Sequence, residues 1–196
     1  MQEHNIISYG DLNDYQKEQA IDIFLEGFGH MITFTKNRAT LQTLFLHAIT
    51  PSLFTCYIEE GQVLGILGIA TNKERPLKFD QDICVNLFGK IKGKLISKQM
   101  NAIFQSPVVT GDRDLYIDVL ATDSKVRGKG IATALLNHAL AKKSFDYCFL
   151  DVFSKNKTAI HLYKKMGFSI YKEKKLSFLA SAVSGLGYPI EMKRTL

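Results

Sequence analysis

The chain has 196 residues, which is long enough for one well-buried domain and short for two. Hydrophobic residues make up 46% and charged residues 22%, which excludes a disordered chain, and no apolar run approaches the roughly 20 residues that cross a bilayer. The net charge of +6 suits an anionic partner, but the basic residues are dispersed and match no nucleic-acid-binding motif, so we expect neither a nucleic-acid nor a membrane partner.

The first residues show no basic start followed by an apolar stretch, so we predict a cytoplasmic protein. The three cysteines, Cys56, Cys84 and Cys148, are far apart and form no CxxC pair. Such spacing gives no framework for disulfides or zinc, and the histidines have no ligand-like spacing. We therefore predict no metal.

The first part of the chain predicts a strand, two helices and a β-hairpin with Gly61 at its turn. Asp11 or Asn13 is the expected cap of the first helix, and the second helix stops before Pro51. In chain order these elements occupy residues 5–9, 11–28, 36–49, 53–59 and 63–71.

Residues 72–112 are too long for a simple connection between strands. Their apolar residues recur at four-residue steps, which predicts one kinked helix or two short ones, although Gly89 and Gly93 weaken a helix. We predict that residues 82–105 form a mobile lid over the acceptor side of a pocket. Its expected inward residues are Leu87, Ile91 and Leu95.

The remaining elements alternate between strands and helices, which predicts an α/β fold with helices on both faces of one sheet. The predicted strands are 114–122, 147–153, 168–171 and 188–192, and the predicted helices are 131–143 and 156–166. We find no linker or repeat, so residues 1–196 are expected to form a single domain.

A glycine-bearing turn at residues 123–130 joins a predicted strand directly to a helix. The first turn of a helix carries unpaired N–H groups and partial positive charge, and Gly128 and Gly130 have no side chain to block close approach. Arg127 and Lys129 add positive charge. The turn therefore predicts a phosphate cradle, although neither a Walker loop nor a GxGxxG fingerprint is present.

Two motifs together resemble those of the GNAT superfamily of N-acetyltransferases. The first is Arg127-x-x-Gly130-x-Ala132, and the second is a strand and an asparagine followed by Ala159-x-x-x-Tyr163-x-x-x-Gly167-Phe168. The resemblance covers residues 116–171 closely. It implies an α/β fold with a mixed, mostly antiparallel sheet flanked by helices. Residues 72–112 depart from the compact form of the family as a helical insert between the third and fourth strands.

The resemblance also implies where acetyl-CoA binds. The cosubstrate would enter an opening between the strand that ends at Thr122 and the strand that ends at Phe153. Its pantetheine arm would pair with the first of these strands, its pyrophosphate would lie on the turn, and Asn156 would touch the pantetheine or diphosphate. The implied contacts are Leu120, Ala121, Thr122, Arg127, Gly128, Lys129, Gly130, Ile131, Ala132 and Asn156.

Aminolysis of a thioester needs a base for the amine and an acid for the departing thiolate. The resemblance puts Tyr163 near the sulfur, and a phenol is protonated at pH 7, so Tyr163 is the expected acid. The base is open between Asp118 and Asp151, directly or through water.

These features predict an N-acetyltransferase that moves an acetyl group from acetyl-CoA to a primary amine, preferably of a small molecule because the insert would narrow the acceptor side. A protein N-terminus or lysine is the alternative acceptor. A non-catalytic acyl-CoA-binding regulator is the rival from another class, and a basic nucleic-acid-binding protein is a third interpretation. A monomer and a homodimer are equally compatible with the sequence.

Overall fold

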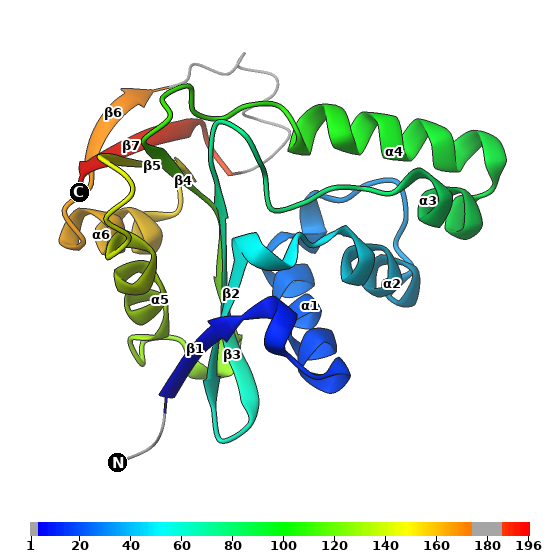
Figure 1. Ribbon diagram of the computed structural model, residues 1–196, viewed down its shortest axis with the longest axis horizontal. Coiled ribbons are helices and arrows are strands. Elements are labelled where there is room, and N and C mark those ends of the chain that lie inside the picture. The colour runs from blue at the N-terminus through cyan, green and yellow to red at the C-terminus, as the bar shows by residue number, and fades with distance from the viewer. Residues whose placement is uncertain (1–3, 174–185) are drawn as a thin grey trace.

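The computed structural model describes residues 4–173 and 186–196. Within these residues seven strands form one sheet in the order β1-β2-β3-β4-β5-β7-β6 (Figure 1). β4 and β5 are parallel and the other neighbours are antiparallel, so the predicted mixed, mostly antiparallel sheet is confirmed. The strands are β1 (His4–Ser8), β2 (Phe54–Glu59), β3 (Gln62–Ala70), β4 (Asp114–Thr122), β5 (Tyr147–Phe153), β6 (Ser169–Glu173) and β7 (Pro189–Thr195).

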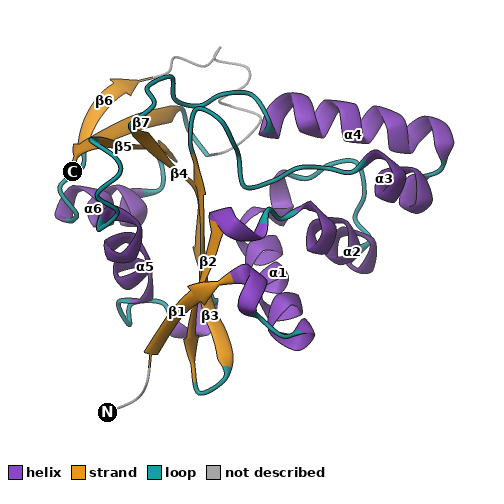
Figure 2. Ribbon diagram, in the orientation of Figure 1, coloured by secondary structure: helices purple, strands orange, loops and turns teal. Residues whose placement is uncertain are grey.

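Helices cover both faces of the sheet (Figure 2). On one side α1 (Asp14–Phe28) packs on β3 and β4, and α2 (Arg38–Ala48), α3 (Gln81–Phe88) and α4 (Lys90–Phe104) follow beyond it in the same apolar cluster. Two lie on the other: α5 (Ile131–Leu140) and α6 (Lys157–Lys165). Among the described residues, none of these helices is long and apolar enough to cross a membrane.

Local signals explain several of the element boundaries. Asn13 begins α1 with a capping box, in which its side chain accepts from the Gln16 amide and the Gln16 side chain accepts from the Asn13 amide. The β2–β3 turn uses positive φ angles at both Glu60 (51°) and Gly61 (76°), as a tight hairpin requires. Gly167, with φ of 85°, ends α6 as the sequence predicts.

Each face of the sheet buries its own apolar cluster. The first contains residues from α1 to α4 packed on inward side chains such as Phe54, Ile66 and Val119. The second joins α5 and α6 to side chains such as Ile117 and Leu150. β4 contributes to both clusters, so it is held firmly where the candidate site begins.

The insert between β3 and β4 consists of two helices, which is one of the two arrangements that the sequence predicts. Gly89, at φ of 82°, separates α3 from α4. Gly93 is buried at the contact between the two helices, where an added Cβ would collide with the backbone of Cys84 and Val85. The second glycine therefore permits close packing of α3 on α4.

The predicted inward face of the insert is wrong for two of its three residues. Ile91 is 87% exposed and Leu95 is 54% exposed, whereas Leu87 packs partly against the core. The residues of α4 that face inward are Gly93, Ile96, Ser97 and Met100. The four-residue spacing identified a helix but not its buried face, because Gly93 was not counted as a packing residue.

Candidate active site

The sheet opens between its two parallel strands. β4 and β5 pair only over Asp114–Ile117 and Tyr147–Leu150. Beyond that point β4 continues beside β3, and β5 continues beside β7 (Figure 1). On its β5 side, the segment Leu120, Ala121 and Thr122 therefore has no strand partner among the described residues, and its backbone faces the opening.

A bulge shapes β4 at the point where the opening begins. Gly68 of β3 pairs with Val119 and Ile69 pairs with Ile117, which leaves Asp118 as an extra residue in β4. A β-bulge bends a strand and redirects a side chain, and such bulges are common beside active sites. The bulge places Asp118 on the face that carries the insert, as its ion pair with Arg75 shows.

The turn after β4 presents a set of backbone amides to solvent. Gly128 and Gly130 are exposed and have φ of 84° and 86°, and a Cβ added at either would meet nothing within 4 Å. Among the described residues, no hydrogen bond is donated by the amides of Arg127, Gly128, Gly130, Ile131 and Ala132. Unpaired amides at the beginning of a helix fit a phosphate group, so the predicted cradle has the required form.

Other predicted contacts lie around the cradle. Arg127 is 61% exposed and its Nη2 lies 3.9 Å from Glu26 of α1, a surface pair that an anion can replace. Lys129 is also exposed. Asn156 begins α6, where its Oδ1 accepts from the Ala159 amide at 3.1 Å. The carbonyl of that side chain therefore has a structural role, which leaves its amide nitrogen as the group suited to a ligand.

Asp118 forms a buried, two-pronged ion pair with Arg75. Nε and Nη2 of the guanidinium donate to the two carboxylate oxygens at 3.0 and 2.7 Å, and both side chains are 10% exposed. Nη1 donates to the backbone carbonyls of Ile103 and Ser106, each at 3.0 Å, at the end of α4. Burial raises the pKa of Asp118, and Arg75 counteracts part of that rise. One guanidinium thus ties the insert to β4.

Tyr116 and Asp151 form a second polar contact on the same face. The pKa of the Tyr116 phenol is raised, first by burial, then by the carboxylates of Asp151 and Asp118, and also by a hydrogen bond with Asp151. Asp151 is exposed on β5, opposite Glu191 of β7. The Asp151 carboxylate therefore reaches solvent while its neighbour Tyr116 holds it beside β4.

Tyr163 approaches from the opposite face of the sheet. It is 8% exposed and belongs to the buried cluster that also contains Ile117 and Leu150, the last residues at which β4 and β5 pair. Its ring packs against Phe168 with centroids 6.0 Å apart. Burial, with a smaller effect from Cys148, raises the pKa of Tyr163 to about 12. The phenol is thus protonated at any physiological pH.

The predicted residues come from three parts of the fold: β4, the turn into α5, and β5 with α6. Sequence reasoning missed Tyr116 and Arg75. Tyr116 lies within the strand that was predicted correctly, and its partner Asp151 was already a candidate. Arg75 is 43 residues from Asp118 in the chain, and no sequence pattern links the two.

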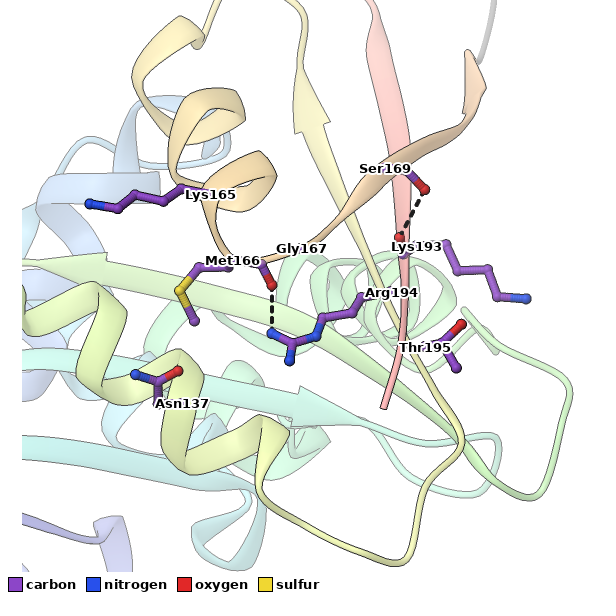
Figure 3. Close-up of a pocket in the computed structure, with 8 residues that line it drawn as sticks. All are labelled: Asn137, Lys165, Met166, Gly167, Ser169, Lys193, Arg194 and Thr195. Atoms are coloured by element: carbon purple, nitrogen blue, oxygen red, sulfur yellow. Dashed lines mark hydrogen bonds between the residues drawn. The ribbon is translucent and has the colours of Figure 1, made fainter.

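A separate surface pocket of about 610 Å³ lies away from this opening (Figure 3). It is lined by α5, the end of α6 and β7, and Arg194 donates there to the Met166 carbonyl. Thr195 in its lining pairs with Tyr147, the first residue of β5, whereas the opening lies beyond Leu150. The pocket is therefore at the other end of β5. Among the described residues, no group of three or more His, Cys, Asp or Glu side chains is arranged to hold a metal ion.

Comparisons with known proteins agree with this fold. The family model described as Acetyltransferase (GNAT) family matches residues 18–168. Similar solved structures include a GCN5-related N-acetyltransferase from Kribbella flavida (16% identity, 98% of each chain covered, TM-score 0.62). An N-acetyltransferase from Staphylococcus aureus is also similar (16% identity, 96% of this chain and 99% of that chain covered, TM-score 0.63).

At these identities, the structural similarity establishes the fold and not the acceptor. No curated protein matches the chain by sequence. The family match spans most of the chain, including the cradle and the helix that carries Tyr163. The chain therefore belongs to the GNAT family of acetyltransferases.

Proposed function

We propose that the protein is an N-acetyltransferase that moves the acetyl group of acetyl-CoA to a primary amine. The observation that carries the proposal is the opening between β4 and β5, which leads to the unpaired amides at the beginning of α5. The GNAT family transfers acetyl groups and in general uses acetyl-CoA, so the remaining questions are which residues act and which amine is acetylated.

In this proposal the chain holds the cosubstrate mainly through its backbone. The free edge of Leu120, Ala121 and Thr122 pairs with the pantetheine amides, as an added strand would. The amides from Arg127 to Ala132 receive the pyrophosphate, while Lys129 and Arg127 add charge at the rim. The side-chain amide nitrogen of Asn156 donates a hydrogen bond to the pantetheine arm. Acetyl-CoA supplies an activated thioester.

Tyr163 is the proposed general acid. Its phenol is protonated because burial raises its pKa to about 12. A departing thiolate needs a proton at the moment that the carbon–sulfur bond breaks, and a phenol in a dry site supplies it without competing water. Tyr163 belongs to the same buried cluster as Ile117 and Leu150, the last paired residues of β4 and β5, and this shared cluster supports the role.

Asp151 is the better base of the two carboxylates that the sequence left open. The Asp118 side chain is only 10% exposed and both of its oxygens already accept hydrogen bonds from Arg75, so an incoming amine has poor access to it. Asp151 is exposed on the same face, where it can take a proton from the ammonium form of the acceptor, directly or through water. We assign Asp118 to positioning, since with Arg75 it fixes the insert beside β4.

The acceptor is proposed to be a small primary amine. Arg75 fastens the end of α4 to the sheet next to Asp118, which supports a confined acceptor side. The carboxylates on that face favour a cationic acceptor.

The proposal is tested by incubating the full chain with acetyl-CoA and a panel of small amines, N-terminal peptides and lysine peptides, with products identified by mass spectrometry. Acetylation of small amines in preference to peptides is the expected result. Preference for a peptide would identify a protein acceptor. Binding of acetyl-CoA without any acetylated product would identify a non-catalytic regulator and overturn the proposal.

A further inference from the structure

The outer face of α4 is an exposed apolar row. Its inner face packs on the core through Gly93, Ile96 and Met100. At 3.6 residues per turn, the side opposite to those residues carries Ile91 and Leu95, followed by Lys98 and Ala102. Ile91 is 87% exposed and Leu95 is 54% exposed. Two large aliphatic side chains are thus exposed on the side of α4 opposite its packed face, and α4 itself lies at the edge of the molecule (Figure 1).

Lysines surround this row. α4 contains Lys90, Lys92, Lys94 and Lys98 and no aspartate or glutamate. On the helical wheel Lys90 and Lys94 lie along one side of the row, Lys92 lies along the other, and Lys98 continues the row beyond Leu95. Lys92 is engaged locally, because its Nζ donates to the Phe34 carbonyl at 3.3 Å and lies 5.7 Å from the centre of the Phe88 ring.

The shape and charge of this face restrict what it can contact. A convex ridge offers no groove for side chains of a partner protein. A second copy placed on it would oppose lysines with lysines, and like charges across an interface are unfavourable. A planar layer of anionic head groups can pair with Lys94 and Lys98 while the aliphatic side chains enter the boundary below the head groups.

We propose that α4 docks the protein on the surface of an anionic lipid bilayer, with Ile91 and Leu95 inserted and Lys94 and Lys98 on the head groups. The contact is interfacial, and it departs from the expectation from sequence that the protein has no membrane partner. It is independent of the function proposed above, because neither the cradle nor the carboxylates take part.

The experiment measures co-sedimentation of the full chain with vesicles of phosphatidylcholine containing about one third phosphatidylserine, at about 0.1 M salt. The wild-type protein should bind these vesicles and not vesicles of phosphatidylcholine alone. The double variant Lys94→Gln, Lys98→Gln should bind about thirtyfold more weakly, since each lysine near an anionic surface contributes about fivefold. Ile91→Gln with Leu95→Gln should weaken binding at least tenfold.

Two control variants remove exposed lysines and an exposed apolar side chain from other helices. Lys164→Gln with Lys165→Gln removes two exposed lysines from α6, and Tyr15→Gln removes a 61% exposed apolar side chain from α1. These controls should bind as the wild type does. All of these positions are exposed, so equal melting temperatures will show that the variants are folded.

Three results would overturn the proposal. The first is failure of the wild-type protein to bind the anionic vesicles. The second is a loss of binding that is not specific to both parts of the α4 face. Equal weakening in the α4 variants and the controls would show this, and so would weakening in the lysine variant alone, which would exclude insertion of Ile91 and Leu95. The third is a wild-type dimer in sedimentation equilibrium that dissociates in the Ile91→Gln, Leu95→Gln variant, which would identify a second copy as the occupant.

Discussion

Replacing Arg75 by methionine should destabilise the protein strongly. The change removes four hydrogen bonds, two to Asp118 and two to the carbonyls of Ile103 and Ser106. It also leaves a carboxylate that is 10% exposed without its counter-ion. Breaking a buried pair in this way costs about 3–5 kcal/mol of unfolding free energy, a large part of the roughly 5–15 kcal/mol of an ordinary domain.

The loss should depend on pH. Burial raises the pKa of Asp118 in the folded protein, and Arg75 counteracts part of that rise, so removing Arg75 raises this pKa further. Between the unfolded pKa of about 3.9 and the folded pKa, the folded state binds more protons, and stability falls as pH rises. In Arg75→Met this pH range, from the unfolded to the folded pKa of Asp118, is wider than in the wild type. The difference between the two proteins should therefore be smallest near about pH 4 and grow as the pH is raised.

Urea unfolding of the two proteins from about pH 4 to 8 measures both effects. The double variant Arg75→Met, Asp118→Asn should recover much of the lost stability, because neutral partners remove the buried charge. Arg113→Met is the matched control. Arg113 and Asp146 form the same two-pronged contact, with both bonds at 2.7 Å, but their side chains are 56% and 52% exposed, so the change should matter little. A loss below about 1 kcal/mol in Arg75→Met, or one independent of pH, would refute the reasoning.

Three further predictions concern the site and the insert. Tyr163→Phe should lower kcat by about 10²–10⁴-fold and leave the Kd for acetyl-CoA unchanged, and near wild-type kcat where chemistry limits the rate would return Tyr163 to a packing role. Asp151→Asn should lower kcat by about 10²-fold or more in the same assay, and equal activity would remove Asp151 as the base. Gly93→Ala should destabilise the protein, because a Cβ at Gly93 collides with the backbone of Cys84 and Val85. In an open helix the same change would stabilise by about 1 kcal/mol, so a rise in melting temperature would contradict that packing.

Most of the fold was predictable because the periodicity of its elements is strong. β4 and β5 have the predicted bounds, since an alternating strand ends where glycines and polar residues begin. The cradle was predictable for a related reason: Gly128 and Gly130 adopt the positive φ that a glycine between strand and helix suggests. These features are local in the chain, and local features leave a pattern in the sequence.

The contacts that were missed are not local. The Arg75–Asp118 pair joins a loop of the insert to a bulge in β4, and neither periodicity nor a motif records it. The buried face of α4 was inverted because two aliphatic residues, Ile91 and Leu95, seemed better core candidates than Gly93. Close packing of two helices favours the smallest residue, glycine, at the contact. A pattern of apolar side chains does not include glycine and therefore does not place it on the buried face.

Calorimetric titration of acetyl-CoA into Gly130→Val asks directly whether acetyl-CoA lies on the amides at the beginning of α5. Gly61→Val is the matched control: Gly61 has a similar φ of 76°, also has nothing within 4 Å of an added Cβ, and lies in the β2–β3 turn. Valine is strained at the positive φ of both positions, but only at Gly130 would it block the cradle. We predict at least tenfold weaker binding in Gly130→Val and unchanged binding in Gly61→Val. Wild-type affinity in a folded Gly130→Val protein would contradict the account.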